Sequence, residues 1–101
     1  MDELLHECCT VIHRFFTETI TAQDYHEVVA CLRYILETLG QDVVSKAMPD
    51  ICKTIGCPTT YSPFDHMERL RFGISFYADE KDLHPATIAL KETWNRVRAP
   101  I

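Results

Sequence analysis

Two amphipathic helical patterns follow one another at the start of the chain, and they constrain the fold more than any other feature. Apolar residues recur at spacings of three and four from Leu4 to Ile20 and again from Tyr25 to Leu39. Between the patterns, Thr21 stands at an N-cap position and Asp24 at the position that closes a capping box. Gly40 supplies the residue that ends the second helix. The sequence therefore predicts an opening helical hairpin.

A third helical pattern runs through a proline. Apolar residues keep a helical spacing from Val44 to Ile55, but Pro49 removes a backbone donor and clashes with the preceding turn. We therefore expect one helix ending near Met48 and a second beginning at Pro49, which Gly56 stops. The loop that follows begins at Cys57 and ends at Tyr61.

Two more helices are predicted in the C-terminal half. Ser62 as cap, Pro63 at the first position and Asp65 as capping-box acid open one of them. Its C-terminal end is ambiguous, because residues 72–76 fit a helical face and also alternate as a short strand would. His84 and Pro85 open the last helix. The fold class expected is all-α, a compact antiparallel bundle of five or six helices forming a single domain over residues 1–101, with a strand at 72–76 left open.

Composition agrees with an ordinary globular domain. The chain is 47% hydrophobic and 25% charged, with a net charge of −5. No apolar run approaches the roughly 20 residues that span a bilayer, and the acidic start at Asp2 and Glu3 is unlike a secretory signal. We therefore expect an intracellular protein, cytoplasmic or nuclear, without a membrane segment. The five cysteines, an odd number, are expected to be reduced thiols.

The first two helical patterns are each apolar around about half of the helix circumference, which is more than a surface helix needs to bury. A first helix that runs through the centre of the fold would explain this, and so would a partner that covers the surplus. The second explanation predicts a non-catalytic protein–protein interaction module that binds a partner protein or a second copy of itself, of the adaptor, inhibitor or viral accessory type. The aromatic anchors predicted for this surface are Phe15, Phe16, Phe72, Phe76 and Trp94.

A second hypothesis is a zinc-stabilised or redox-active protein. His6, Cys9 and His13 share one face of the first helix, and a fourth ligand could come from Cys52, Cys57, His66 or His84. The competing interpretation is two histidines at a helix margin beside a buried thiol, because paired cysteine knuckles are missing. Cys57, in a loop before Pro58, is also a candidate for an exposed reactive thiol. No cofactor is required by the first hypothesis.

A third hypothesis is nucleic-acid binding through the C-terminal helix. It depends on Lys91, Arg96 and Arg98 beside Trp94. Basic residues near a helix C-terminus are also what the helix dipole favours, and the chain as a whole is acidic. The sequence contains no glycine-rich phosphate loop, no H-E-x-x-H and no calcium loop. Nucleic acid is therefore not the expected partner, and no catalytic residue is predicted.

Overall fold

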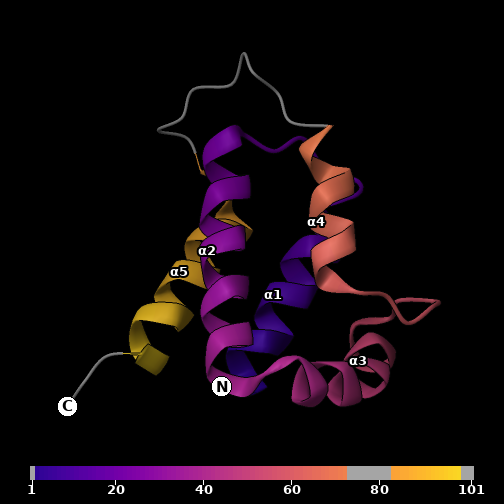
Figure 1. Cartoon of the computed structure of the whole chain (residues 1–101). Helices are drawn as coiled ribbons and strands as arrows, with labels where there is room; N and C mark the ends of the chain where they lie inside the picture. The colour runs from indigo at the N-terminus through magenta and orange to yellow at the C-terminus, as the bar shows by residue number, and fades with distance from the viewer. Residues whose placement is uncertain (1, 73–82, 99–101) are drawn as a thin grey trace.

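The computed structural model describes residues 2–72 and 83–98, and these residues form five α-helices (Figure 1). The helices are α1 (Asp2–Phe15), α2 (Ala22–Leu39), α3 (Gln41–Ile55), α4 (Pro63–Arg71) and α5 (Pro85–Arg98). The all-α prediction is confirmed. Figure 1 shows α2, α4 and α5 extending up and down the molecule, with α3 running across its lower end.

Local signals placed the ends of α2 and α3 correctly. The Asp24 backbone N–H donates to Thr21 Oγ1 at 3.0 Å, and the Thr21 N–H donates to Asp24 Oδ2 at 2.9 Å, which is a complete capping box. Gly40 and Gly56 follow α2 and α3 with positive φ angles of 85° and 79°. An L side chain rarely adopts such angles, which explains why both helices end at glycine.

Helix α1 is shorter than the apolar pattern predicts. It ends at Phe15, and the next residues form tighter turns, with the Thr17 N–H donating to the Arg14 carbonyl at 3.1 Å. The Thr17 hydroxyl donates to the same carbonyl at 3.0 Å. A threonine that satisfies a helical carbonyl in this way competes with continuation of the helix. The predicted extension to Ile20 is therefore wrong.

Helix α3 is continuous through Pro49, so the predicted division into two helices is wrong. The carbonyl that loses its hydrogen bond belongs to Ser45, and both Ser45 and Pro49 are exposed. Water can satisfy that carbonyl, which reduces the cost of a proline inside a helix.

Helix α4 begins at Pro63 as predicted, but Ser62 makes no side-chain cap hydrogen bond. The helix ends at Arg71, with Phe72 as its C-cap. The choice between helix and strand at 72–76 falls almost wholly outside the described residues, which stop at residue 72 and resume at 83.

Helix α1 occupies the centre of the fold and contacts each of the other four helices. The apolar residues of its predicted arc, except Phe16, are at most 2% exposed. They are Leu4, Leu5, Cys8, Cys9, Val11, Ile12, Phe15 and Ile20. The wide arc is thus buried within a single copy of the chain, and the expectation that this helix leaves a broad apolar surface for a partner is wrong. Of the two explanations for the arc, the central helix is correct.

Candidate functional site

A groove of about 530 Å³ opens where the C-terminal end of α1 meets the loop between α3 and α4. Its walls come from three segments that are distant in the sequence: the end of α1 with the turn after it, the end of α3 with its loop, and the second turn of α4. The lining residues are Thr10, His13, Arg14, Phe16, Thr17, Ile55, Cys57, Pro58, Thr59, Tyr61 and His66.

The wall at the end of α1 presents an exposed phenylalanine directly after the helix. Phe16 is 45% exposed, whereas the neighbouring Phe15 is 2% exposed. Helix α1 ends between these two residues, so Phe16 begins the turn and its ring lies at the groove instead of in the core. The helix end thereby places an aromatic ring on the surface beside Arg14.

Tyr61 fixes the loop wall to α1. Its ring is buried, and its hydroxyl donates to the Cys9 carbonyl at 2.9 Å across a sequence separation of 52 residues. Nearer the start of the loop, the Cys57 thiol donates to the Thr59 carbonyl at 3.1 Å. These two contacts give the loop a defined conformation against the central helix.

His66 joins the walls. Its ring lies 4.1 Å from the Tyr61 ring and 5.2 Å from the Phe16 ring, the latter in an edge-to-face arrangement of 82°. Its Nδ1 lies 3.1 Å from the Ser62 carbonyl, within hydrogen-bond distance. The three rings form a continuous aromatic wall, which we call the aromatic wall of the groove.

The buried groups behind the groove are neutral at neutral pH. Burial raises the pKa of the Cys9 thiol to about 12, and burial also raises the pKa values of Cys52 and Tyr61. Arg14 is the one lysine, arginine, aspartate or glutamate among the described residues that line the groove. The groove therefore offers an apolar, aromatic surface with one cation at its rim.

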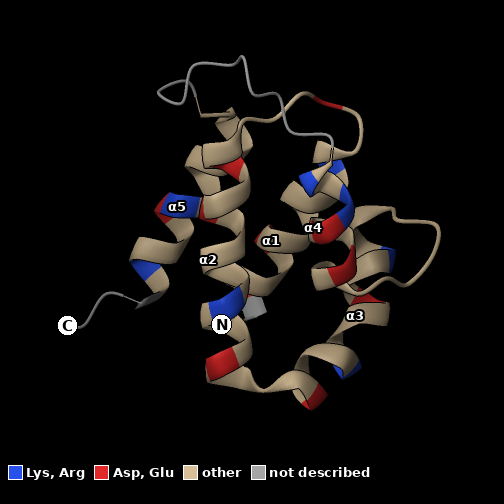
Figure 2. Cartoon of the chain, turned by 45° about the horizontal axis from the view of Figure 1, so that its top comes forward, with Lys and Arg blue, Asp and Glu red and all other residues tan. Residues whose placement is uncertain are grey.

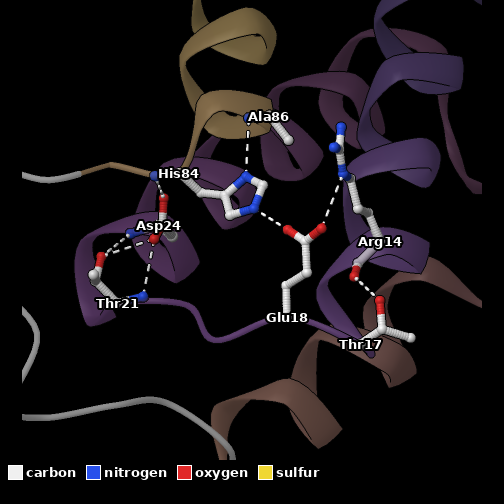
Figure 3. A network of polar contacts seen from close by, with 7 residues as sticks. All are labelled: Arg14, Thr17, Glu18, Thr21, Asp24, His84 and Ala86. Atoms are coloured by element: carbon white, nitrogen blue, oxygen red, sulfur yellow. Dashed lines mark hydrogen bonds and ion pairs between the residues drawn. The ribbon is translucent and has the colours of Figure 1, made fainter.

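A polar network joins the end of α1 to the starts of α2 and α5 (Figure 3). Asp24 is 1% exposed and accepts hydrogen bonds from the Thr21 N–H and hydroxyl and from the His84 N–H at 2.9 Å. Burial would raise the pKa of Asp24, but these bonds and the Thr87 hydroxyl outweigh it and hold the pKa below its usual value. Asp24 thus joins the start of α2 to the start of α5.

His84 completes this network. Its Nδ1 accepts from the Ala86 N–H at 3.0 Å, and its Nε2 pairs with Glu18, whose other oxygen lies 3.3 Å from Arg14 Nε. Partial burial opposes ionisation of Glu18, but Arg14 and His84 lower its pKa overall. The arrangement connects α1, the turn after it and α5, and we assign it a structural role.

The predicted anchors do not lie together. Phe15 is in the core, 5.4 Å from the His84 ring, and Trp94 is half-buried against Tyr34 with ring centroids 6.0 Å apart. Phe72 is 88% exposed at the end of α4. Phe76 lies outside the described residues. Of the five residues, the groove contains Phe16.

The three residues of the zinc hypothesis point to different places. Cys9 is fully buried and its thiol donates to Met48 Sδ at 3.8 Å, while His13 lines the groove. His6 lines a separate depression beside Ala47. Among residues 2–72 and 83–98, no three histidine, cysteine or acidic side chains are grouped so that they could hold a metal ion.

Two of the cations in the nucleic-acid hypothesis lie beside acids. Lys91 Nζ is 3.4 Å from Glu27, and Arg96 pairs with Glu3. Figure 2 shows basic and acidic positions interspersed over the helices. A positively charged stripe typical of nucleic-acid binding is therefore not formed by these two residues. Within the part of the chain that the structure describes, no helix combines the length and apolarity needed to cross a bilayer.

Sequence reasoning identified Cys57 and the loop but did not identify Tyr61 or His66 as parts of one site. Both depend on contacts between segments that are far apart in the chain, and no local pattern encodes them. Comparison with family models, with curated proteins and with solved structures finds no match to this chain.

Proposed function

We propose that the chain is a non-catalytic protein–protein interaction module that binds a segment of a partner protein in the groove beside Phe16. One observation carries the proposal: the apolar arc of α1 is buried except at its end, where the Phe16 ring is 45% exposed beside an open groove. Aromatic side chains next to a cavity are the residues that most often dominate binding energy.

The chemistry of the groove favours a particular ligand. The aromatic wall suits an aromatic or branched aliphatic side chain, which would be removed from water against Phe16, Tyr61 and His66. Arg14 at the rim suits a carboxylate two or three residues away. We therefore expect an extended peptide with one apolar anchor and a nearby acidic residue.

Selection from a displayed random peptide library tests the proposal. We expect the purified full chain to enrich peptides with this pattern, and Phe16→Ser to weaken their binding at least about tenfold, which corresponds to about 1.4 kcal/mol. Ile88→Ser is the matched control, because Ile88 is 46% exposed on α5 and does not line the groove. Equal binding to both variants would exclude the groove as the binding site.

Self-association is the other form of this function, with a second copy as the partner. Sedimentation across a dilution series distinguishes it, since a dimer formed through the groove should be weakened by Phe16→Ser and not by Ile88→Ser. A strict monomer that also selects no peptide would contradict the proposed function in both forms.

A further inference from the structure

Two cysteines meet at the inner edge of the groove. Cys52 lies in the last turn of α3 and is 2% exposed, whereas Cys57 is half-buried and lines the groove. The Cys57 backbone N–H donates to the Cys52 carbonyl at 2.8 Å, so the two residues are joined directly at the end of α3. Cys57 is also one of the groups whose proximity raises the pKa of the Cys52 thiol.

The backbone explains this proximity. Gly56 adopts the left-handed conformation, with φ 79° and ψ 20°, and so turns the chain back at the end of α3. The hydrogen bond from residue 57 to residue 52 closes this turn. A disulfide requires two cysteines whose backbones lie close together, and this hydrogen bond brings residues 52 and 57 together at the helix end.

A second cysteine pair provides an internal comparison. Cys8 on α1 and Cys31 on α2 also lie close enough for Cys31 to raise the pKa of the Cys8 thiol, but each is 0% exposed. The two pairs have the same chemistry but differ in how easily an oxidant reaches them. Cys57 lines the groove, whereas neither Cys8 nor Cys31 is exposed.

We propose that Cys52 and Cys57 form a reversible disulfide when a small hydroperoxide enters the groove. The Cys57 thiol gives up its proton and the thiolate attacks one peroxide oxygen, which breaks the O–O bond and makes Cys57 a sulfenic acid. The other oxygen leaves as hydroxide or alkoxide, takes up that proton and becomes water or an alcohol. The Cys52 sulfur then attacks the Cys57 sulfur, the S–O bond breaks, and hydroxide takes the Cys52 proton and leaves as water. The two thiols lose two electrons in total, and the peroxide gains them.

Burial assigns the order of the two steps. Cys57 lines the groove and therefore meets the oxidant first. Cys52 is 2% exposed, so a peroxide in the groove does not reach its sulfur directly. Burial raises the pKa of the Cys52 thiol, although the Tyr61 backbone N–H opposes this by hydrogen-bonding to its sulfur. Cys52 is therefore the resolving cysteine, which reacts once a sulfenic acid is beside it.

Oxidation would alter the groove. The hydrogen bond from the Cys57 thiol to the Thr59 carbonyl, 3.1 Å long, is lost when the thiol proton is removed. The wall containing Pro58 and Thr59 loses that restraint. This consequence for peptide binding rests on the proposed function, whereas the disulfide itself does not.

Peptide mapping after peroxide treatment tests the proposal on the full, reduced chain. Hydrogen peroxide is added, free thiols are alkylated in denaturant, and the protein is digested with trypsin. Lys53 lies between the two cysteines, so the disulfide joins two separate tryptic peptides, 47–53 and 54–69. We expect this joined species as the main product, with a mass lower than the sum of its free-thiol peptides by two hydrogens, and its loss on reduction by dithiothreitol.

Two variants separate the roles. Cys52→Ser should remove the joined species and leave a Cys57 sulfenic acid that dimedone traps, and Cys57→Ser should leave neither product. A joined species from Cys8 and Cys31 as the main product would overturn the proposal, as would a bond from Cys9 to Cys52, a dimer linked through Cys57, or a Cys57 sulfinic acid beside a free Cys52. Because the readout is a mass, a failure of peptide binding leaves it unaffected.

Discussion

The two sides of α1 are closed by different means, and two adjacent phenylalanines mark the difference. On the closed side, Phe15 is buried with its ring 5.4 Å from the His84 ring. There His84, at the start of α5, is bonded to Asp24 on α2 and pairs with Glu18 in the turn after α1. On the open side, Phe16 is 45% exposed with its ring 5.2 Å from His66, and a groove remains. The same pairing of phenylalanine with histidine thus serves the core on one side and a surface on the other.

The two sides differ in the segment that covers them, which is a helix on the closed side and a loop on the open side. The closed side is covered by α5, whose first residues are held by a buried carboxylate. The open side is covered near α3 by a loop, which the Tyr61 hydroxyl and the hydrogen bond at the end of α3 hold in place. A loop supplies fewer apolar atoms than a helix, so this side retains a groove.

The largest effect should follow from exchanging the two phenylalanines for alanine one at a time. Phe15→Ala removes a buried ring and should lower the free energy of unfolding by about 3–5 kcal/mol, a large part of the total for a small domain. Phe16→Ala should cost about 1 kcal/mol or less, because the ring is half in water. Urea unfolding measures both, and equal losses would show that the two sides are not distinct.

A smaller effect is expected for the carboxylate that closes the first side. Asp24→Ala leaves the buried Thr21 N–H and the part-buried His84 N–H without their acceptor and should cost about 1.5–3 kcal/mol. Asp50→Ala is the matched control, because Asp50 is an exposed acid within a helix. If the two variants unfold at the same urea concentration, Asp24 does not hold α5 in place.

The same carboxylate predicts the acid dependence of stability. The pKa of Asp24 is lower in the folded protein than its usual value near 4, so its stabilisation is present above that pH and is lost as the pH falls through the lower folded pKa. Glu18 acts in the same direction. Unfolding free energies from pH 7 to 3 should therefore fall at the acid end. Asp24→Asn should flatten that fall, and an unchanged slope in this variant would assign the effect to other acids.

Local interactions made part of this fold predictable. The capping box at Thr21 and the two glycines that end α2 and α3 act within four or five residues, so the sequence alone places them. The end of α1 was missed because hydrophobic periodicity does not register the Thr17 hydroxyl bonded to the Arg14 carbonyl. The division at Pro49 was wrong because the sequence does not show that Ser45 is exposed, so that water can satisfy the carbonyl that the proline leaves without a donor.

The site was less predictable, because it depends on distant contacts. Tyr61 meets the Cys9 carbonyl 52 residues away, and His84 meets Asp24 across 60 residues. Neither contact has a spacing that a reader of the sequence could detect. Phe15 and Phe16 have the same side chain, and the sequence could not sort them into core and surface, since that depends on which helix covers which side.

A smaller effect than that of Asp24 is expected at Gly56, which turns the chain at the end of α3. An added Cβ meets no atom within 4 Å, so the cost of Gly56→Ala comes from its positive φ alone and should be about 1–2 kcal/mol. Gly56→Asn is the matched control and should recover part of this loss, because asparagine tolerates the left-handed conformation. Hydrogen exchange of Gly56→Ala compares the two sides directly. The Cys57 N–H, bonded to the Cys52 carbonyl, should lose more protection than the fall in global stability explains. The His84 N–H, bonded to Asp24, should lose only as much as the fall in global stability explains. Equal losses at both amides would mean that the two sides of α1 open together, and the groove would then be no more independent of the core than the polar network is.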